Sequence, residues 1–253
     1  MSENDDKYTK GMVDWSVSDN ATVKNYCLWQ YQLISEYIGK DILEIGAGSG
    51  RLSEIIVARN QYDSYVSIEP SDKFFSELSN DTAIKGRVSV FKMTSKELDK
   101  KYYNSFDTML LIHVLEHIED DLTTLEGLKP FLKKSGKLII MVPSYNFLFS
   151  DLDRRIGHYR RYNKKMLKDM ANLLDLNIYK MQYTNVLGIF GWFWFCKVRK
   201  CNFNDTSKKN EIVKGFRFFD KYLLPFVTKI ENNFNLPLGL NLTCVLTKKD
   251  DLP

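Results

Sequence analysis

The chain has 253 residues, of which 44% are hydrophobic and 27% charged, and its formal net charge is +4. These values are ordinary for a soluble globular protein, and the length suffices for one large α/β domain or a domain with a cap. The charge is too small to indicate a nucleic-acid-binding protein by itself.

Residues 1–40 are expected to form a polar arm followed by a helix over 21–38. Aromatic residues, Tyr26 and Trp29 among them, recur at helical spacing, and Gly39 ends the helix before the first strand. The simpler interpretation is that these aromatic side chains pack in the core. In the alternative, Asn25, Tyr26 and Trp29 cover a ligand site at the end of that strand.

The next stretch, residues 41–52, has the sequence DILEIGAGSGRL. Its apolar run predicts a buried strand, which ends in glycines at alternate positions before a helix begins. Glycine suits such a turn because it adopts positive φ and lets a ligand lie against the backbone. The pattern Glu44-x-Gly46-x-Gly48-x-Gly50 differs from the G-x-G-x-x-G fingerprint of dinucleotide-binding proteins. A glycine turn without a ligand is the alternative.

An acid follows the second predicted strand, residues 65–68. Glu69 comes nineteen residues after Gly50, at the carboxyl end of this strand. A carboxylate there can accept hydrogen bonds from both ribose hydroxyls of an adenosine ligand. An acid after a strand is otherwise usually solvated, but the order strand, glycine turn, helix, strand and acid predicts a nucleoside site.

Further strands are expected at 88–91, 106–112 and 137–142. The run 106–112 is almost continuously apolar, as buried parallel strands are. Because strands and helices alternate, we predict an α/β fold with a doubly wound, mostly parallel seven-stranded sheet and right-handed crossovers. A sixth strand at 176–183 and an antiparallel last strand at 242–247 are expected to form a hairpin.

Ligands of doubly wound sheets bind at the carboxyl ends of the strands. The predicted strands place five residues on this rim: Gly46, Glu69, Met93, His113 and Pro143. After the fourth strand the chain is expected to run from His113 into a helix that carries Leu122, Leu125, Leu128 and Leu132.

The segment 144–163 follows the fifth strand at this rim and is not simply a helix. It contains the densest positive cluster of the chain, which consists of Arg154, Arg155, Arg160 and Arg161. A solvated loop is the usual explanation of a charge run. Guanidinium groups, however, bind phosphate or carboxylate bidentately, and aromatic residues interleave these arginines. We predict an anionic substrate that contacts Tyr145, Arg154, Arg155, His158, Tyr159, Arg160, Arg161, Tyr162 and Trp192.

Residues 184–240 form an insertion between the last two strands, and we predict that they cap the acceptor side of the site. The large apolar residues between 187 and 195 need a burial partner. A second helical run is expected over 216–229, whereas Gly188 and Gly191 disfavour a regular helix in the first part. Two other burial partners stay open, a second copy of the chain and a membrane surface, the latter suggested by Lys197, Arg199 and Lys200.

The glycine turn with Glu69, the run 114–120 (VLEHIED) and the closing strand pair resemble class I S-adenosylmethionine (SAM) methyltransferases of the ubiquinone-O-methyltransferase-like kind. The resemblance covers roughly residues 21–247. It implies a single methyltransferase domain over 1–253, with SAM as cofactor and S-adenosylhomocysteine as product. The domain then divides into four parts: an arm and helix at 1–40, a SAM-binding core at 41–183, a cap insertion at 184–240, and the last strand and tail at 241–253.

In this architecture the loop after the third strand lines the adenine edge, often with an aspartate. Here the loop is Lys92-Met93-Thr94, so Met93 is expected to pack on the ring and Thr94 to form a hydrogen bond with it. The cofactor site implied by the resemblance comprises Tyr26, Trp29, Glu44, Gly46, Ala47, Gly48, Gly50, Glu69, Pro70, Met93, Thr94, Ile112 and His113.

A narrower resemblance rests on four motifs: Asn25-Tyr26-x-x-Trp29, Gly157-His158-Tyr159-Arg160-Arg161-Tyr162, Asn185-x-x-Gly188-x-x-Gly191-Trp192, and residues 220–225 followed by Pro237-x-Gly239. They are similar to those of bacterial methyltransferases found beside, or fused to, glycosyltransferases in surface-polysaccharide clusters. This resemblance implies methyl transfer to an oxygen of a small anionic metabolite, such as a sugar nucleotide or a phosphorylated or phosphoramidate-type precursor. The protein is then a monomer or a homodimer.

Methyl transfer from a sulfonium is an in-line displacement, in which the protein chiefly aligns the reacting atoms. A neutral hydroxyl acceptor also needs a base, for which histidine is suited, whereas an anionic oxygen needs none. His113 and His158 are the candidate bases, and His117 is expected to form a structural hydrogen bond. The alternatives are a nucleic-acid or protein methyltransferase, and a SAM-binding regulator without catalysis.

The cysteines show no metal-ligand spacing and lie in apolar stretches, as Cys27, Cys196, Cys201 and Cys244. This pattern favours reduced thiols. The first residues are acidic and lack the apolar core of a signal peptide. The apolar stretch 186–196 is far shorter than the roughly 20 residues of a membrane-spanning helix. We therefore expect a cytoplasmic protein without a bound metal or a nucleic-acid partner.

Overall fold

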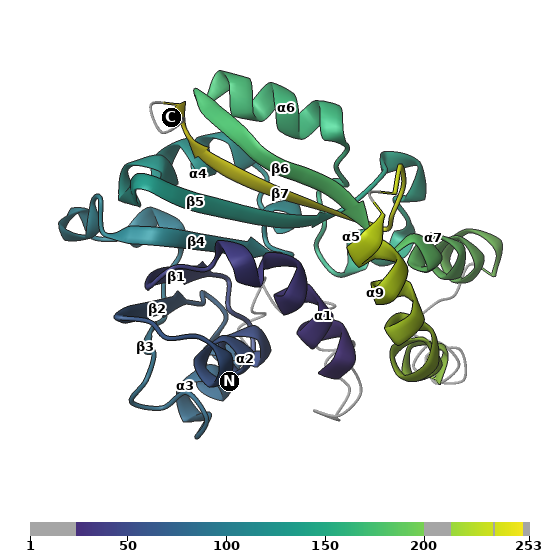
Figure 1. The fold of residues 1–253 in the computed structure, drawn as a ribbon, viewed down its shortest axis with the longest axis horizontal. Coiled ribbons are helices and arrows are strands. Elements are labelled where there is room, and N and C mark those ends of the chain that lie inside the picture. The colour runs from purple at the N-terminus through teal and green to yellow at the C-terminus, as the bar shows by residue number, and fades with distance from the viewer. Residues whose placement is uncertain (1–23, 200–213, 235, 250–253) are drawn as a thin grey trace, which may run out of the picture.

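The computed structural model describes residues 24–199, 214–234 and 236–249. A seven-stranded sheet with the order β3-β2-β1-β4-β5-β7-β6 forms its centre (Figure 1), which confirms the predicted fold class. The strands are β1 (Asp41–Ile45), β2 (Ser64–Ile68), β3 (Ser89–Phe91), β4 (Phe106–Ile112), β5 (Leu132–Pro143), β6 (Leu176–Thr184) and β7 (Asn241–Lys248).

Strands β1 to β5 are parallel to one another, and the strand order reverses between β1 and β4. In a doubly wound sheet such a reversal opens a crevice at the carboxyl ends of the strands. β7 lies between β5 and β6 and is antiparallel to both of them. The last two strands thus form the predicted hairpin, and β7 fills an interior position of the sheet.

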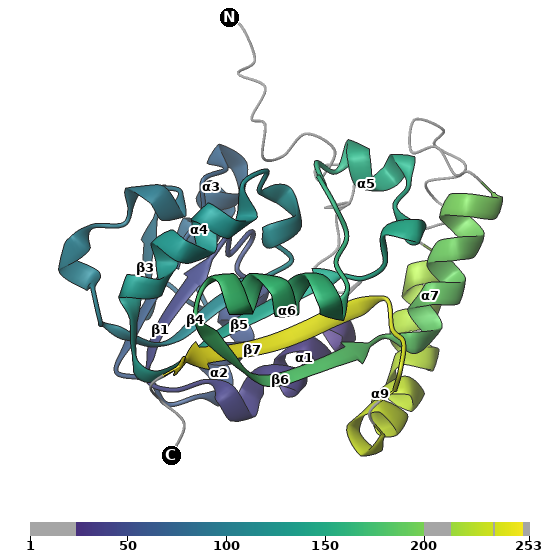
Figure 2. The ribbon, with the colours of Figure 1, turned by 90° about the horizontal axis from the view of Figure 1, so that it is seen from above.

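Helices cover both faces of the sheet. On one face the core contains residues of α1 (Lys24–Ile34), α2 (Arg51–Arg59) and α3 (Asp72–Asn80). On the other face it contains residues of α4 (Asp121–Leu128) and α6 (Lys164–Leu173), and Figure 2 shows α6 lying along β6 and β7. The remaining helices are η1 (Ser35–Tyr37), η2 (Ser95–Glu97), η3 (Lys100–Tyr102), η4 (Leu115–His117), η5 (Lys129–Phe131), η6 (Asn146–Leu148), α5 (Asp151–Arg155), α7 (Val186–Trp192), η7 (Phe193–Val198), η8 (Phe219–Leu223) and α9 (Leu224–Asn233).

Two element predictions were wrong in their extent. β5 begins at Leu132 rather than at 137, because Leu132 pairs with Phe106 of β4 across a register shift. Leu132 therefore belongs to a strand and not to the preceding helix. The second helical run of the insertion is also longer than predicted: it includes 214–218, the π-helix η8 and α9.

Gly188 and Gly191 were expected to disfavour a regular helix, but both lie in α7. Asn185, at positive φ, caps this helix: its side-chain oxygen accepts a hydrogen bond from Gly188 N at 3.0 Å. A Cβ at position 188 would lie 2.4 Å from the Asn185 side chain, so glycine is required for the cap. The cap offsets the low helix propensity of glycine.

The helices of the insertion lie at one end of the sheet, beyond β6 and β7 (Figure 1). Asp220 accepts hydrogen bonds from the backbone of Tyr26, at 2.8 Å, and through its carbonyl oxygen from the side chain of Asn25, at 3.2 Å. Glu231 accepts from the backbone nitrogens of Asn185 and Val186. Both acids are buried and tie the insertion to α1 and to the end of β6.

A third apolar cluster joins the insertion to α5, with Leu152 packed against Ile156, Trp192, Phe195, Cys196 and Phe216. Other apolar side chains of the insertion are exposed, namely Phe190, Phe193, Trp194, Val198, Phe218, Tyr222 and Phe226. The insertion therefore packs against the parent domain with only part of its apolar surface. Among the residues that the structure describes, no helix is long and apolar enough to span a membrane.

Candidate active site

The glycine turn lies between β1 and α2. Gly46, Gly48 and Gly50 all have positive φ, which explains why the sequence places glycine at alternate positions. A Cβ at Gly46 would lie 2.7 Å from Val114, and one at Gly50 would lie 2.6 Å from Leu78. A Cβ at Gly48 would meet no atom within 4 Å, so this glycine borders open space. The turn is tightly packed at its two ends and open in the middle.

Glu69 stands next to this opening. Its two carboxylate oxygens accept hydrogen bonds from Gly48 N, at 2.8 Å, and Ser71 N, at 2.9 Å. The residue is 4% exposed and is followed by the half-buried Pro70. The predicted cofactor residues of the first two strand ends are thus brought together.

Glu44 of β1 is hydrogen-bonded to two neighbouring elements. Its carboxylate accepts hydrogen bonds from Ser53 and Tyr65 at 2.5 and 2.7 Å and from Ser67 at 3.3 Å. Burial raises the pKa of Glu44, although these hydroxyl donors oppose the shift. All three donors bond to Oε2 and come from α2 and β2, so Glu44 joins these two elements to β1, and its predicted cofactor contact stays a prediction.

Tyr26 and Trp29 of α1 pack against each other with ring centroids 5.4 Å apart. The hydroxyl of Tyr26 accepts a hydrogen bond from Asn241 at 2.7 Å, and burial raises the pKa of Tyr26 to about 12. Trp29 is 1% exposed and belongs to the core, as the simpler interpretation of the sequence had it. Its ring offers no exposed face for the predicted cofactor contact.

The loop after β3 holds Met93 and Thr94, both partly exposed. Met93 packs against the core, whereas the backbone nitrogen and hydroxyl of Thr94 both donate to Glu97. Thr94 therefore caps η2 at its first turn. Its contact with adenine stays a prediction. Ile112, at the end of β4, is also partly exposed and packs beneath the turn together with Ala47.

His113 follows β4 directly and has φ +57, a conformation unusual for residues other than glycine. Its backbone nitrogen donates to Met141 of β5 at 2.8 Å. The ring nitrogen Nδ1 lies 3.2 Å from Oε1 of Glu116. The other ring nitrogen, Nε2, is buried and has no hydrogen-bond partner among the described residues. His113 therefore combines one ring nitrogen held by Glu116 with one buried ring nitrogen that has no partner among the described residues, directly after β4.

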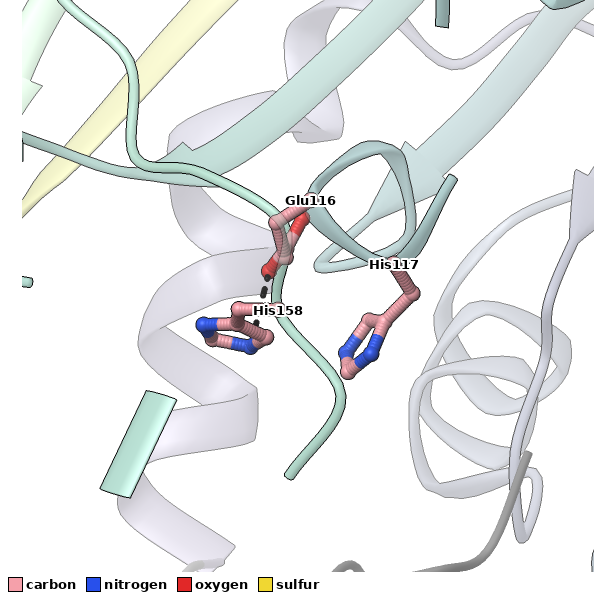
Figure 3. A group of neighbouring side chains, drawn as sticks. All are labelled: Glu116, His117 and His158. Atoms are coloured by element: carbon pink, nitrogen blue, oxygen red, sulfur yellow. Dashed lines mark ion pairs between the residues drawn. The ribbon is translucent and has the colours of Figure 1, made fainter. Parts of the chain in front are cut away.

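Glu116, His117 and His158 form a compact cluster next to His113 (Figure 3). Glu116 is fully buried, and its Oε1 lies 3.9 Å from Nε2 of His158. Burial opposes ionisation of Glu116, but the histidines that surround it hold its pKa below the ordinary value. The rings of His117 and His158 meet edge to face at 4.6 Å, and burial lowers the pKa of His117 to about 4.

Asp153 orients the ring of His158 through Nδ1. Nδ1 of His158 lies 2.9 Å from Oδ1 of Asp153, an oxygen that also accepts from Nε of Arg161 at 2.9 Å. Burial opposes ionisation of Asp153, but the hydrogen bond from His158 and the charge of Arg161 keep its pKa below the ordinary value. The other oxygen of Asp153 accepts from Ser150. Asp153 therefore connects the start of α5 to His158 and Arg161, two residues of the motif 157–162.

Two of the predicted substrate-binding residues, Arg161 and Tyr162, are buried and hold the loop 144–163 in place instead. Arg161 is 1% exposed, and its guanidinium lies 4.4 Å from the ring centroid of Trp192. Tyr162 is fully buried and donates to Asp121 at 2.7 Å, and burial raises its pKa. The prediction that Arg161 and Tyr162 contact a substrate does not fit these positions, because neither side chain reaches solvent.

The remaining residues of the loop stay accessible to different degrees. Arg160 is paired with Asp121 at 2.5 Å but keeps part of its side chain exposed. Arg154 pairs with Asp151, and Arg155 and Tyr159 are exposed. Tyr145 stacks on Tyr183 at 4.9 Å. Trp192 is partly buried and donates to Leu148 O. The predicted cluster is therefore not one continuous basic patch.

Glu116 and Asp153 were not predicted as site residues. Each lies next to a residue that was, Glu116 three positions after His113 and Asp153 five positions before His158. The periodicity of the run 113–120 does not distinguish a buried carboxylate from a solvated one. A carboxylate at helical spacing from a candidate histidine base was the only available signal.

A methyltransferase-domain family model matches residues 30–181 of the chain, more than half of its length. The chain therefore belongs to this methyltransferase family. Together with the seven-stranded fold and the glycine turn, the match defines a class I SAM-dependent methyltransferase. SAM is the cofactor implied by the family.

Among solved structures, the chain is similar to a SAM-dependent methyltransferase from Archaeoglobus fulgidus, with a TM-score of 0.55, 14% identity, and coverage of 88% of this chain and 94% of the other. A possible histamine N-methyltransferase from Thermotoga maritima gives a TM-score of 0.56 and 17% identity, with 90% and 91% covered. At these identities the likeness shows the fold alone.

A curated relative is a hybrid PKS-NRPS synthetase of Penicillium oxalicum, which is 26% identical over 119 residues. The matched part is 44% of this chain but only 3% of the synthetase. The likeness therefore concerns one small segment of a much larger protein.

Proposed function

We propose that this methyltransferase transfers the methyl group of SAM to an oxygen of a small anionic acceptor, a precursor of a bacterial surface polysaccharide. The observation that carries the proposal is the orientation of His113. Its Nδ1 faces Glu116 at 3.2 Å, and its buried Nε2 has no partner among the described residues. A carboxylate that orients an imidazole leaves the second nitrogen available to take a proton from an acceptor hydroxyl.

The cofactor in this proposal lies along the glycine turn. Gly48 borders open space, and Glu69 is fixed beside it by two backbone donors. In that position the carboxylate of Glu69 suits the ribose hydroxyls of SAM. β1 and β4 are adjacent parallel strands, so His113, which follows β4, lies at the same rim as the glycine turn that would hold SAM.

The acceptor side of the proposal rests on the loop 144–163. Arg154 and Arg155 are exposed, and Arg160 keeps about a quarter of its side chain exposed (26%) next to Asp121. An acceptor phosphate or carboxylate would compete with Asp121 for the guanidinium of Arg160, since both anions suit its geometry. The narrower motif resemblance supports the polysaccharide-precursor class, and the exposed arginines support its negative charge.

We also propose that residues 184–240 cap the acceptor side. Trp192 of α7 lies against Arg161 and donates to Leu148, so the insertion contacts the loop that follows β5. A cap formed in this way narrows access to the rim and favours a small acceptor over a nucleic acid or a protein.

The test is a SAM-dependent mass gain on candidate acceptors, namely sugar nucleotides, phosphorylated intermediates and nucleotide-linked phosphoramidates. His113→Asn is the matched variant, because asparagine tolerates positive φ but is no base. We expect kcat to fall by roughly 10²–10⁴ at saturating SAM and acceptor. Glu119→Gln, an exposed acid three residues beyond Glu116, should keep wild-type rates.

Wild-type kcat in His113→Asn would contradict the role of His113 as the base. A mass gain on RNA or protein, with none on small anions, would contradict the proposed acceptor class. Either outcome leaves the assignment to the methyltransferase family intact.

A further inference from the structure

Three side chains capable of metal ligation converge beside His113. One ligand atom each from Glu116, His117 and His158 lies within 4.8 Å of the others (Figure 3). Glu116 and His117 belong to η4, whereas His158 follows α5, so two segments distant in the sequence form the cluster. We propose that these three residues bind a divalent first-row transition metal ion, with zinc as the reference ion.

The carboxylate of Glu116 needs a further partner. The residue is fully buried, and Oε1 faces His113 Nδ1 at 3.2 Å. Its second oxygen, Oε2, is buried without a hydrogen-bond partner among the described residues. An unsatisfied oxygen of a buried carboxylate is costly, and such groups in native proteins are normally paired or coordinate a metal. The oxygen that faces His158 is Oε1, at 3.9 Å from Nε2, so a cation between Glu116 and the two histidines binds through Oε1 and neutralises the buried carboxylate whose other oxygen has no partner among the described residues.

The orientation of His158 is already that of a metal ligand. Nδ1 faces Oδ1 of Asp153 at 2.9 Å, and a carboxylate can only accept there, so the ring donates from Nδ1. In the neutral ring, Nε2 then carries the lone pair, and this atom lies 3.9 Å from Glu116. Histidine ligands in proteins are typically oriented by a carboxylate on their other nitrogen. Arg161 and Ser150 hold Asp153 in place for that role.

The spacing and the donor set select the kind of ion. Ligands about 2.1 Å from a tetrahedral ion lie roughly 3.4 Å apart. The three ligand atoms lie within 4.8 Å of one another, so their separations shrink by up to about 1.4 Å when the ion enters. Two imidazoles and one carboxylate suit zinc and its neighbours, whereas calcium and magnesium prefer oxygen ligands. Three protein ligands leave a coordination position open. If the proposed function holds, this position is available to an acceptor oxygen beside His113.

The test is calorimetric titration of zinc into the full chain, prepared without a polyhistidine tag and stripped with a chelator. We expect one equivalent to bind the wild type. Glu116→Gln and His158→Asn should each weaken binding at least about 10-fold, and Asp153→Asn by about 10–100-fold, as for other outer-shell carboxylates. Glu119→Gln makes the same chemical change as Glu116→Gln on an exposed residue and should bind as the wild type does.

Cobalt(II) provides a second readout that reports the ligands. The wild type should give the visible absorption of a four-coordinate site with nitrogen and oxygen donors, and Glu116→Gln should lose it. A thiolate charge-transfer band would instead place the ion at cysteine and overturn the proposal. So would the absence of zinc binding, or equal zinc affinity in the wild type and the ligand variants.

Thermal unfolding in the presence of chelator identifies variants that fail to fold. If Glu116→Gln fails to fold, His117→Gln takes its place in the titration. The titration contains neither SAM nor an acceptor, so it is independent of the proposed function. If the protein binds S-adenosylhomocysteine but does not bind zinc, only the metal site is overturned. Zinc binding without methyl transfer to any small anion overturns only the proposed acceptor class.

Discussion

The proposed cofactor side and the proposed acceptor side, both at the carboxyl ends of the strands, are built in different ways. On the cofactor side, the groups around the opening at Gly48 are backbone amides and a carboxylate supplied by residues 46–71. On the acceptor side, η4, the loop 144–163 and the insertion contribute side chains that hold one another through buried ion pairs and ring contacts. The cofactor side is therefore local in the sequence, whereas the acceptor side depends on contacts between distant segments.

This difference determines which amino-acid substitutions each side tolerates. A cofactor site made of backbone groups constrains residue type mainly through φ and through space for the ligand. An acceptor site made of interlocked side chains constrains it through charge pairing, because an unpaired buried charge is strongly destabilising. Four substitutions, from the largest expected effect to the smallest, test this contrast.

Gly48→Val should remove detectable binding of S-adenosylhomocysteine in calorimetry. Gly48 has φ +58, which strains valine, and its Cβ position opens into the space proposed for the ligand. Gly127→Ala is the control: this glycine lies in α4, with no atom within 4 Å of its Cβ position. The control should bind normally and gain about 0.5–1 kcal/mol of stability. Normal binding by Gly48→Val would place the ligand elsewhere.

Asp153→Ala should lower the free energy of unfolding by about 3–5 kcal/mol in urea denaturation, because it leaves the buried Arg161 unpaired. Asp151→Ala removes an exposed acid from the same helix, and its pair with Arg154 is worth less than about 1 kcal/mol. The double variant Asp153→Ala/Arg161→Met should recover part of the loss. Equal effects of the two single variants would show that the acceptor side does not depend on buried pairing.

Glu69→Ala should weaken S-adenosylhomocysteine binding by about 1.5–3 kcal/mol, the range for a hydrogen bond to a charged group. The loss is smaller than for Gly48→Val because the turn itself stays open. Glu77→Ala, an acid on the exposed part of α3, serves as the control in the same calorimetric titration. If Glu69→Ala leaves the affinity unchanged, the ribose of the ligand does not bind at Glu69.

Asp220→Asn tests the link between the insertion and α1, with the smallest expected effect. Burial raises the pKa of Asp220 in the folded protein, so the folded state binds the proton more tightly than the unfolded state does. Asp220 therefore makes the protein less stable as pH rises from its unfolded pKa through its folded pKa. The amide oxygen of asparagine can still accept from Tyr26 N, which limits the change at pH 7 to about 1 kcal/mol.

The measurement is urea denaturation of wild type and Asp220→Asn across the acidic range and at pH 7. The stability of the variant relative to the wild type should rise with pH. Asp169→Asn, an exposed acid on α6, should show no such trend. A relative stability that falls with pH would mean that the Asp220 carboxylate is stabilised, not penalised, by its surroundings.

The fold and the glycine turn could be predicted because their signals are local. Alternation of apolar strands with helices predicted the doubly wound sheet, and the positive φ of Gly46, Gly48 and Gly50 accounts for the glycine spacing. Glu44 shows the limit of this reasoning. Its place in the motif suggested a ligand contact but gave no sign of its three hydroxyl donors, which come from α2 and β2.

The acceptor side could not be predicted in the same detail. The arginines of the loop 144–163 look equivalent in the sequence, yet Arg161 is buried against Asp153 and Trp192 whereas Arg154 is exposed. Their difference is set by which acid each one meets after folding. Glu116 and His158 likewise become neighbours only when the loop after α5 returns to η4.

The position of β7 has a consequence for how the protein is made. β7 is synthesised after the whole insertion, yet it occupies the place between β5 and β6. Until β7 leaves the ribosome, β5 and β6 each present an unpaired edge, and such edges recruit other strands. The sheet therefore closes late, and the nascent chain exposes unpaired strand edges for longer than a protein whose strands pair in the order of their synthesis.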